Sequence, residues 1–406
     1  MWLSFDDGDH WQSLRLDMPA ISVRDLQVKD DSTCLCADLV AATHGRGFYI
    51  LDNLTPFRQA AEAKAASGAY LFRPATALRV RFATNDPTPW PPEVPAGENP
   101  LPGGIVDYQL GVDASAPVTL AILDAAGKIV RSYSSDDAQL NPDPAIDQAG
   151  YDKVCQKTPT ATFCGLPLYW PAPAMSVSTK AGLHRFNWDL HFNPVTVENV
   201  ADAGDEDATG AVPHRTYPTV NAPWAPPGAY TVRLTVGGRS YTQPLTLRLD
   251  PRVKTAAAGL AQLASLSREM YDAALATHAA QLQARALAEK LTALSGNDVA
   301  AFRAKVDSLA PKPSTGGGPI ARFLRRRGGA AAAPTLEAVT NSLVAAAMAM
   351  QGADIAPTAA EVAACTGARS QSRDVLARWG TLKTADLAAL NARLKAAGQP
   401  AVTLPD

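Results

Sequence analysis

Histidine, serine and the carboxylates carry much of enzymatic chemistry, and the chain contains six histidines. None of them is spaced from a serine or a cysteine in a way that indicates a nucleophilic triad. His44 and Arg46 are the best candidates for contact with a ligand, because the turn sequence THGRG places them almost side by side. The alternative is that this turn packs against a neighbouring part of the fold. We assign no catalytic residue.

Two groups of residues could attract a metal ion. Asp189 and His191 alternate onto one side of an expected strand, with His184 nearby, and carboxylate and imidazole groups suit many metals. An ordinary paired strand is the alternative. An acidic run lacks the regular alternation of a calcium-binding EF-hand loop and is expected to be a solvated loop; its members are Glu198, Asp202, Asp205, Glu206 and Asp207. We therefore expect neither a metal site nor a cofactor.

The segment SFDDGDHW follows the spacing S-x-D-x-G-x-x-W and predicts a tight hairpin. Asp6 can accept hydrogen bonds from backbone N–H groups of its own turn, and Ser4 adds a short polar contact. Gly8 supplies the positive φ that the turn requires. Trp11 returns on the next strand, where it can cover the hairpin and pack. These four residues are therefore interpreted as structural.

Composition along the chain predicts a multidomain protein with β and α parts. Residues 1–56 contain five short strands with tight turns, and residues 57–69 form a short helical or irregular linker. Residues 70–250 alternate as about seven strands of an antiparallel sandwich interrupted by Pro-rich loops. Residues 251–406 have helical periodicity and predict a bundle, with a flexible loop over 311–334.

Two threonines in the helical segment predict helix starts. The spacing of Thr358 and Glu361 matches a capping box. Thr384 is placed to cap the last helix, which carries Leu387, Leu390 and Leu394.

Overall charge argues against strongly acidic partners. The 406 residues carry a net charge of −2, which gives no general reason to expect binding to nucleic acid or to an anionic membrane. No apolar run reaches the length of a membrane span. Cys155 and Cys164 lie in one loop and could form a disulfide in an oxidising compartment, or remain two free thiols.

The N-terminal residues resemble a known family. The hairpin motif and the stretch DLVAATHGRGFYILDNLTP, residues 38–56, are similar to the end of a BNR or Asp-box repeat β-propeller, of the kind found in sortilins, sialidases and some glycoside hydrolases. The resemblance implies one or two terminal propeller blades, a periplasmic or extracellular location, and further blades upstream in the same protein as partners. In such hydrolases the catalytic carboxylates would lie upstream of these residues.

The middle segment resembles Ig-like domains related to the flagellar hook-capping protein. AGLHRFNWDL, residues 181–190, and APPGAYTVRL, residues 225–234, match the G-x-H-x-x-x-W-D and P-G-x-Y patterns. The resemblance implies that Trp188 and Tyr230 are core aromatics of a sandwich, on neighbouring strands or facing sheets. Trp90, Trp170 and Trp224 lie in Pro-rich loops and could stack on sugars or pack against the sandwich.

These observations lead to an expected role and two alternatives. We expect an accessory and structural C-terminal region of a secreted BNR-repeat propeller protein, which supports carbohydrate or protein binding. The first alternative is part of an active glycoside hydrolase, and the second is a sortilin-like scaffold that binds proteins without catalysis. Residues 1–56 are expected to fold incompletely without the upstream blades, because five strands leave much apolar surface uncovered.

Overall fold

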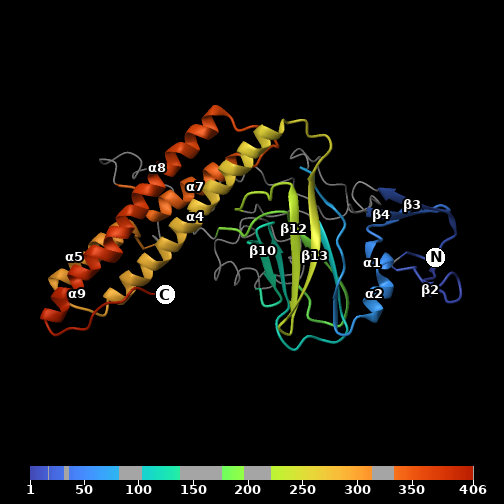
Figure 1. Ribbon diagram of the computed structural model, residues 1–406, viewed down its shortest axis with the longest axis horizontal. Helices are drawn as coiled ribbons and strands as arrows, with labels where there is room; N and C mark the ends of the chain where they lie inside the picture. The colour runs from blue at the N-terminus through green and yellow to red at the C-terminus, as the bar shows by residue number, and fades with distance from the viewer. Residues whose placement is uncertain are drawn as a thin grey trace. The chain divides into compact units, whose positions relative to one another are not determined.

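The computed structural model describes residues 1–16, 18–31, 36–81, 103–137, 176–195, 221–312 and 333–405. The chain divides into two compact units. The first contains residues 1–193 and 224–254, the second contains residues 255–406, and short segments between 194 and 223 are divided between them. All the sheets belong to the first unit, and the long helices belong to the second (Figure 1).

The first unit begins with two small sheets. Strands β1 (Trp2–Leu3) and β2 (Gln12–Ser13) pair as a hairpin. A three-stranded antiparallel sheet follows, in the order β3-β4-β5, with β3 at Val23–Asp31, β4 at Cys36–Thr43 and β5 at Phe48–Leu51. The turn between β4 and β5 contains two glycines with positive φ, which L-residues with side chains rarely adopt. We call β1 to β5 the terminal strands.

The predicted linker is mostly helical. Short helices α1 (Thr55–Arg58) and α2 (Ala60–Ala65) begin at a proline-containing first turn and run through an alanine-rich stretch. Strand β6 (Ala69–Leu71) follows directly. Sequence patterning did not predict this strand, because three residues are too few to show an alternation.

Two further sheets form the centre of the first unit. One has the order β10-β9-β12-β13-β7 and the other the order β11-β8-β6. Their remaining strands are β7 (Ala77–Arg79), β8 (Gly104–Leu110), β9 (Thr119–Leu123), β10 (Ile129–Ser134), β11 (Gly182–Trp188), β12 (Gly228–Val236) and β13 (Arg239–Leu249). Gly237 and Gly238 both have positive φ and form the two-residue turn that joins β12 to β13.

Aromatic side chains join these two sheets. The ring centroids of Trp188 in β11 and Tyr230 in β12 lie 5.4 Å apart, and those of Phe186 and Tyr133 lie 4.5 Å apart. Trp188 is fully buried. The prediction that Trp188 and Tyr230 lie in facing sheets or on neighbouring strands is confirmed. We call these two sheets the facing sheets.

The prediction of a purely antiparallel arrangement is wrong at one pair. Strand β7 runs parallel to β13, with Leu78 opposite Arg248. Parallel neighbours need a long connection, and here the chain between them contains strands β8 to β12. Arg79 at the end of β7 is buried and donates to the carbonyl of Ala225, 2.7 Å away. This edge strand is therefore held by a side-chain bond as well as by the sheet.

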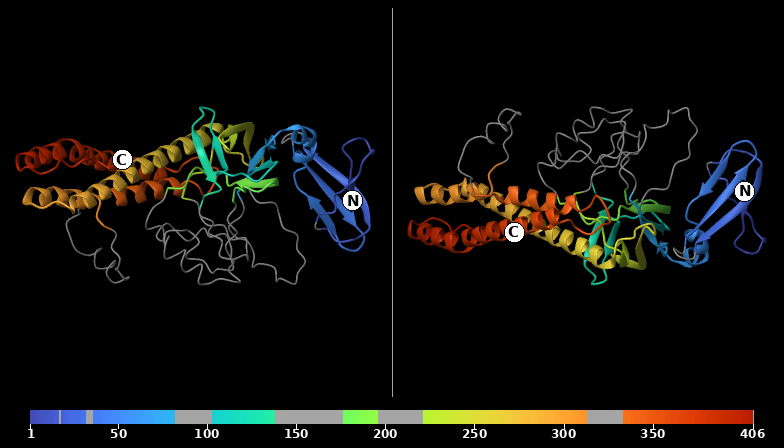
Figure 2. Two further views of the ribbon diagram at one scale, coloured as in Figure 1. Left: turned by 90° about the horizontal axis from the view of Figure 1, so that it is seen from below. Right: turned by 90° about the horizontal axis from the view of Figure 1, so that it is seen from above.

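The second unit is helical, as predicted. Its helices are α4 (Ala257–Leu291), α5 (Asn297–Leu309), α7 (Leu336–Ala349), α8 (Ala359–Thr381), η3 (Leu382–Asp386) and α9 (Leu387–Ala396) (Figure 2). In the part of the chain that the structure describes, no helix is both long and apolar enough to cross a membrane.

Buried polar contacts connect the helices of this unit. The hydroxyls of Thr277 in α4 and Thr340 in α7 are 2.8 Å apart. The predicted capping box of α8 is confirmed, since Thr358 and Glu361 bond reciprocally. The predicted cap at Thr384 is wrong: α8, η3 and α9 follow one another without a break, and the Thr384 hydroxyl donates to the Gly380 carbonyl, 2.8 Å away. The flexible loop predicted at 311–334 lies largely outside the described residues.

Candidate functional site

The hairpin between β1 and β2 has the geometry that its sequence predicts. Asp6 Oδ1 accepts a hydrogen bond from the backbone N–H of His10 at 2.9 Å and from the hydroxyl of Ser4 at 2.8 Å. The backbone N–H of Gly8 donates to Ser4 Oγ at 2.8 Å, and Gly8 has φ +105°. The carboxylate of Asp6 is therefore directed into its own turn.

His10 is a member of this turn that sequence reasoning missed. Its Nδ1 lies 2.6 Å from Asp6 Oδ2. The hydrogen bond from the His10 backbone, followed by those from the His10 and Ser4 side chains, holds the pKa of Asp6 below its usual value. Ser4, Asp6 and His10 are the residue types of a hydrolase triad, but the hydroxyl of Ser4 donates to Asp6, and the described contacts of the imidazole are with Asp6 and not with Ser4. A triad requires the hydroxyl to meet the histidine, so this arrangement is that of a stabilised turn.

Trp11 covers the turn only in part. Its ring lies 3.7 Å from the position that a Cβ on Gly8 would take. The residue nevertheless stays 60% exposed, and Trp2 on the paired strand is 66% exposed. The expectation that Trp11 is packed is therefore wrong for the described chain, and the hairpin presents two large aromatic side chains to solvent.

The three-stranded sheet β3-β4-β5 has apolar side chains on both faces. Its register places Leu26, Ala41 and Tyr49 opposite one another on one face. Ile50 pairs with Val40, and Phe48 with Ala42, on the other face. Phe48 is 74% exposed and Ile50 61% exposed, while Leu26 is also exposed. A sheet that faced solvent on one side would alternate polar and apolar residues. We call the exposed apolar side chains of the terminal strands the terminal surface, which consists of Trp2, Phe5, Trp11, Leu16, Leu26, Val28, Phe48 and Ile50.

A buried polar cluster joins the terminal strands to the facing sheets. Asn53 Nδ2 donates to Asp107 Oδ2 at 3.0 Å, and Arg185 Nε donates to Asp107 Oδ1 at 2.8 Å. The Arg185 guanidinium also reaches the carbonyl of Asp52, 3.4 Å away. Burial raises the pKa of Asp107, while the hydrogen bonds and charge of Arg185 lower it, and the net direction is upward. The carboxylate is thus a buried anchor with two partners on different elements.

Asn53 has a backbone that suits this position. It adopts φ +59°, which asparagine tolerates better than most residues. Its backbone N–H donates to Asp38 Oδ1 in β4 at 2.9 Å. The signal for this cluster was the Asp-Asn pair directly after an expected strand, and sequence reasoning did not use it.

The predicted ligand contacts His44 and Arg46 lie on the exposed turn between β4 and β5. The backbone N–H of His44 donates to the carbonyl of Ser22, and Thr43 donates twice to the carbonyl of Gly47. Neither His44 nor Arg46 lines the pocket described below. The structure therefore brings both residues to an accessible position.

The residues weighed as metal ligands are engaged elsewhere. Asp189 accepts from Arg131 at 3.0 Å and from Tyr133 at 3.3 Å. His191 stacks on Trp224, with centroids 4.1 Å apart, and its burial lowers its pKa to about 4. His184 contacts the carbonyl of Lys180. Within the described ranges, no group of three or more His, Cys, Asp or Glu is placed to hold a metal.

Trp224 packs within the protein, which was the stated alternative to stacking on sugars. Its ring contacts the imidazole of His191, and the guanidinium carbon of Arg81 lies 5.3 Å from the ring centroid. Trp90, Trp170, Cys155, Cys164 and the acidic run from Glu198 to Asp207 lie outside the described residues. The most distinctive feature of the described chain is therefore the terminal surface, together with the buried anchor at Asp107.

Searches of the chain against protein-family models and against curated proteins find no match.

Proposed function

We propose that this chain is an accessory and structural region of a secreted β-propeller protein with Asp-box repeats. Its terminal strands pack against neighbouring blades of the same protein. The observation that carries this proposal is the exposure of apolar side chains on both faces of the sheet β3-β4-β5. A propeller blade is a sheet buried on both faces by the blades beside it, and few other arrangements of a small sheet require apolar residues on both sides.

The hairpin supports the same conclusion. Ser4, Asp6 and Gly8 form a compact turn whose hydrogen bonds are all internal, as expected for an Asp box that stabilises a blade. Trp2 and Trp11 project from this turn into solvent. Aromatic residues with such exposed area are typical of surfaces that are covered by a partner.

The rest of the chain has a supporting role in this proposal. The facing sheets, with Trp188 against Tyr230, favour an Ig-like domain, and Asp107 anchors the terminal strands to it. The occupant of the terminal surface is a neighbouring Asp-box blade, because its own faces are apolar sheets of the same kind. The glycoside hydrolase and sortilin-like alternatives concern the whole parent protein, and the role of this chain is the same in both.

Hydrogen exchange tests the proposal. The chain alone is compared with a longer chain that includes the Asp-box repeats we propose to precede it. We expect amides of β3, β4 and β5 to exchange more slowly in the longer chain, because blade packing covers their faces. If the repeats leave this exchange unchanged, or if the terminal strands alone already exchange as slowly as β12, the proposal is wrong.

A pair of matched variants makes the test specific. Replacing Phe48 and Ile50 by threonine should remove the added protection, since both side chains face the proposed blade. Val112 is equally exposed but lies in the turn after β8 and is not part of the terminal strands. Val112→Thr should leave the protection intact. Protection that survives the double variant would assign the contact to another surface.

A further inference from the structure

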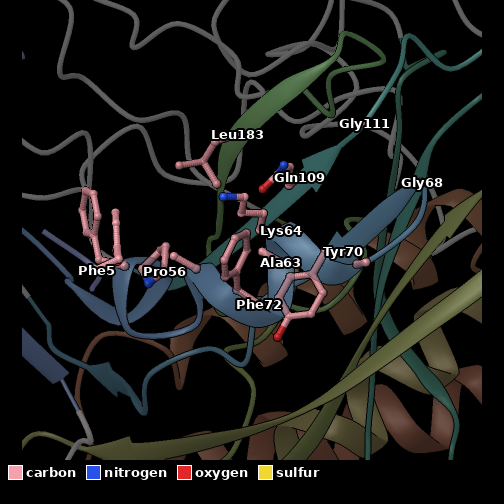
Figure 3. Close-up of a pocket in the computed structure, with 13 residues that line it drawn as sticks. Phe5, Pro56, Ala63, Lys64, Gly68, Tyr70, Phe72, Gln109, Gly111 and Leu183 are labelled. Carbon is pink, nitrogen blue, oxygen red and sulfur yellow. The ribbon is translucent and has the colours of Figure 1, made fainter. Parts of the chain in front are cut away.

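A pocket of about 340 Å³ lies in the first unit, beside the short helices α1 and α2. Its walls come from the hairpin, the two helices, β6, β8 and β11 (Figure 3). Most of the lining is apolar and includes three phenylalanines, namely Phe5, Phe57 and Phe72. The volume is near the lower end of the range for small-molecule sites. A compact ligand with an apolar body fits these walls.

Two polar side chains at the pocket are available to a ligand. Lys64 of α2 and Gln109 of β8 both line it, and Figure 3 shows the ammonium of Lys64 directed to the side of Leu183, with Gln109 close to the Lys64 side chain. Within the described ranges, neither side chain makes a hydrogen bond or an ion pair. A cation and an amide at one end of an apolar pocket are the complement of an anionic head group.

The other polar groups nearby are already engaged. The Tyr70 hydroxyl donates to Glu62 at 2.7 Å and, in Figure 3, points away from Lys64. Sugars require several hydrogen-bonding groups around their hydroxyls, and the described lining offers two unengaged polar side chains, Lys64 and Gln109. A phosphate dianion is best held by an Arg fork or several donors. One ammonium beside one amide matches a single carboxylate.

We propose that this pocket binds a small monocarboxylate with an aromatic or aliphatic body. The carboxylate pairs with Lys64 and accepts a hydrogen bond from the Gln109 amide, while the body contacts Phe57, Phe72 and Leu183. Phe5 belongs both to this pocket and to the terminal surface, but the two polar groups that would hold the carboxylate, Lys64 and Gln109, lie outside the terminal strands. The site also differs from His44 and Arg46, which do not line it.

Isothermal titration of the full chain with sodium phenylacetate tests the proposal. Phenylacetamide serves as the neutral comparison and acetate as the comparison without an apolar body. We expect saturable binding of phenylacetate and weaker binding of both comparisons. Lys64→Gln should weaken phenylacetate about tenfold, as loss of a charge-assisted bond does, and should leave phenylacetamide unchanged.

Two further variants separate the site from general effects. Lys180→Gln removes an exposed ammonium that pairs with Asp113 and does not line the pocket, so it should leave phenylacetate binding unchanged. Leu183→Trp should block all three ligands by filling the pocket. Binding that is equal in the wild-type chain and in Lys64→Gln would overturn the proposal. Absence of saturation throughout the millimolar range would also overturn it.

Discussion

The terminal strands and the facing sheets are both β structure, but they bury their aromatic residues very differently. In the facing sheets Trp188 is 0% exposed and contacts Tyr230 across the gap between two sheets. In the terminal strands Trp2 and Trp11 are mostly exposed, although the hairpin that presents them is well bonded. Turns and strands are hydrogen-bonded in both regions, and among the described residues the difference is the second layer that covers the facing sheets.

This difference separates two contributions to a β fold. Turn bonds and strand pairing determine local geometry, whereas burial between layers provides most of the free energy of folding. The terminal strands have turn bonds and strand pairing, but little burial between layers. Their connection to the remainder of the first unit depends on Asp107, Asn53 and Arg185.

The comparison predicts that equivalent truncations have unequal costs. Trp188→Ala should lower the free energy of unfolding by about 3–5 kcal/mol, because it leaves a large cavity between the facing sheets. Trp2→Ala should change it by less than about 0.5 kcal/mol, since Trp2 is exposed. Urea unfolding followed by circular dichroism measures both. Equal effects would mean that Trp2 is covered in solution and that the contrast between the regions is wrong.

The anchor between the regions gives a smaller predicted effect. Arg185→Met leaves the buried carboxylate of Asp107 without its cation, which should cost about 2 kcal/mol, less than for a fully buried pair because Arg185 is partly exposed. Lys180→Met breaks the exposed pair with Asp113 and should cost under about 0.5 kcal/mol.

Hydrogen exchange sharpens this prediction. The amides of β3 to β5 should exchange faster in Arg185→Met than in the wild-type chain, whereas those of β12 should change less. A uniform change across the first unit would show that Asp107 stabilises the facing sheets and not the connection.

Sequence patterns predicted the regular parts of the molecule well. The alternation predicted over residues 70–250 as about seven strands is confirmed by strands β7 to β13. The helical periodicity predicted over residues 251–406 is confirmed by the helices α4 to α9. Strand β6 was missed because it is short, and the parallel pairing of β7 was missed because patterning carries no information on direction.

The candidate sites were harder to predict. The internal bonds of the Asp6 turn follow from local spacing, since all of its partners lie within four residues. The Asp107 anchor joins residues 54 and 78 positions apart, and no local pattern marks such a contact. The pocket at Lys64 was missed for the same reason, because its walls come from segments that are distant in the chain.

Polar substitution of the terminal surface should have little effect on stability. Phe48→Thr should change the free energy of unfolding of the chain alone by less than about 0.5 kcal/mol, because its side chain is mostly exposed. Phe186→Thr, in the facing sheets, is the matched variant and should be strongly destabilising, since Phe186 is buried against Tyr133. Thermal unfolding compares the two. A large loss in Phe48→Thr would show that this face is covered within the chain itself.

The smallest predicted effect concerns the Asp6 turn, which joins β1 to β2 in the terminal strands. Hydrogen bonds from His10 and Ser4 lower the folded pKa of Asp6 below 3.8, so its contribution to stability is present above the unfolded pKa and is lost as the pH falls through the folded pKa. The His10 amide signal in nuclear magnetic resonance should therefore titrate with a midpoint below that value. Asp6→Ala should abolish the titration and speed exchange of this amide, whereas Asp9→Asn should leave both unchanged, because no described contact involves the Asp9 side chain. A titration midpoint at or above 3.8 would mean that the Asp6 turn is open in solution. The terminal strands would then differ from the facing sheets in their hydrogen bonding as well as in the burial of their aromatic residues.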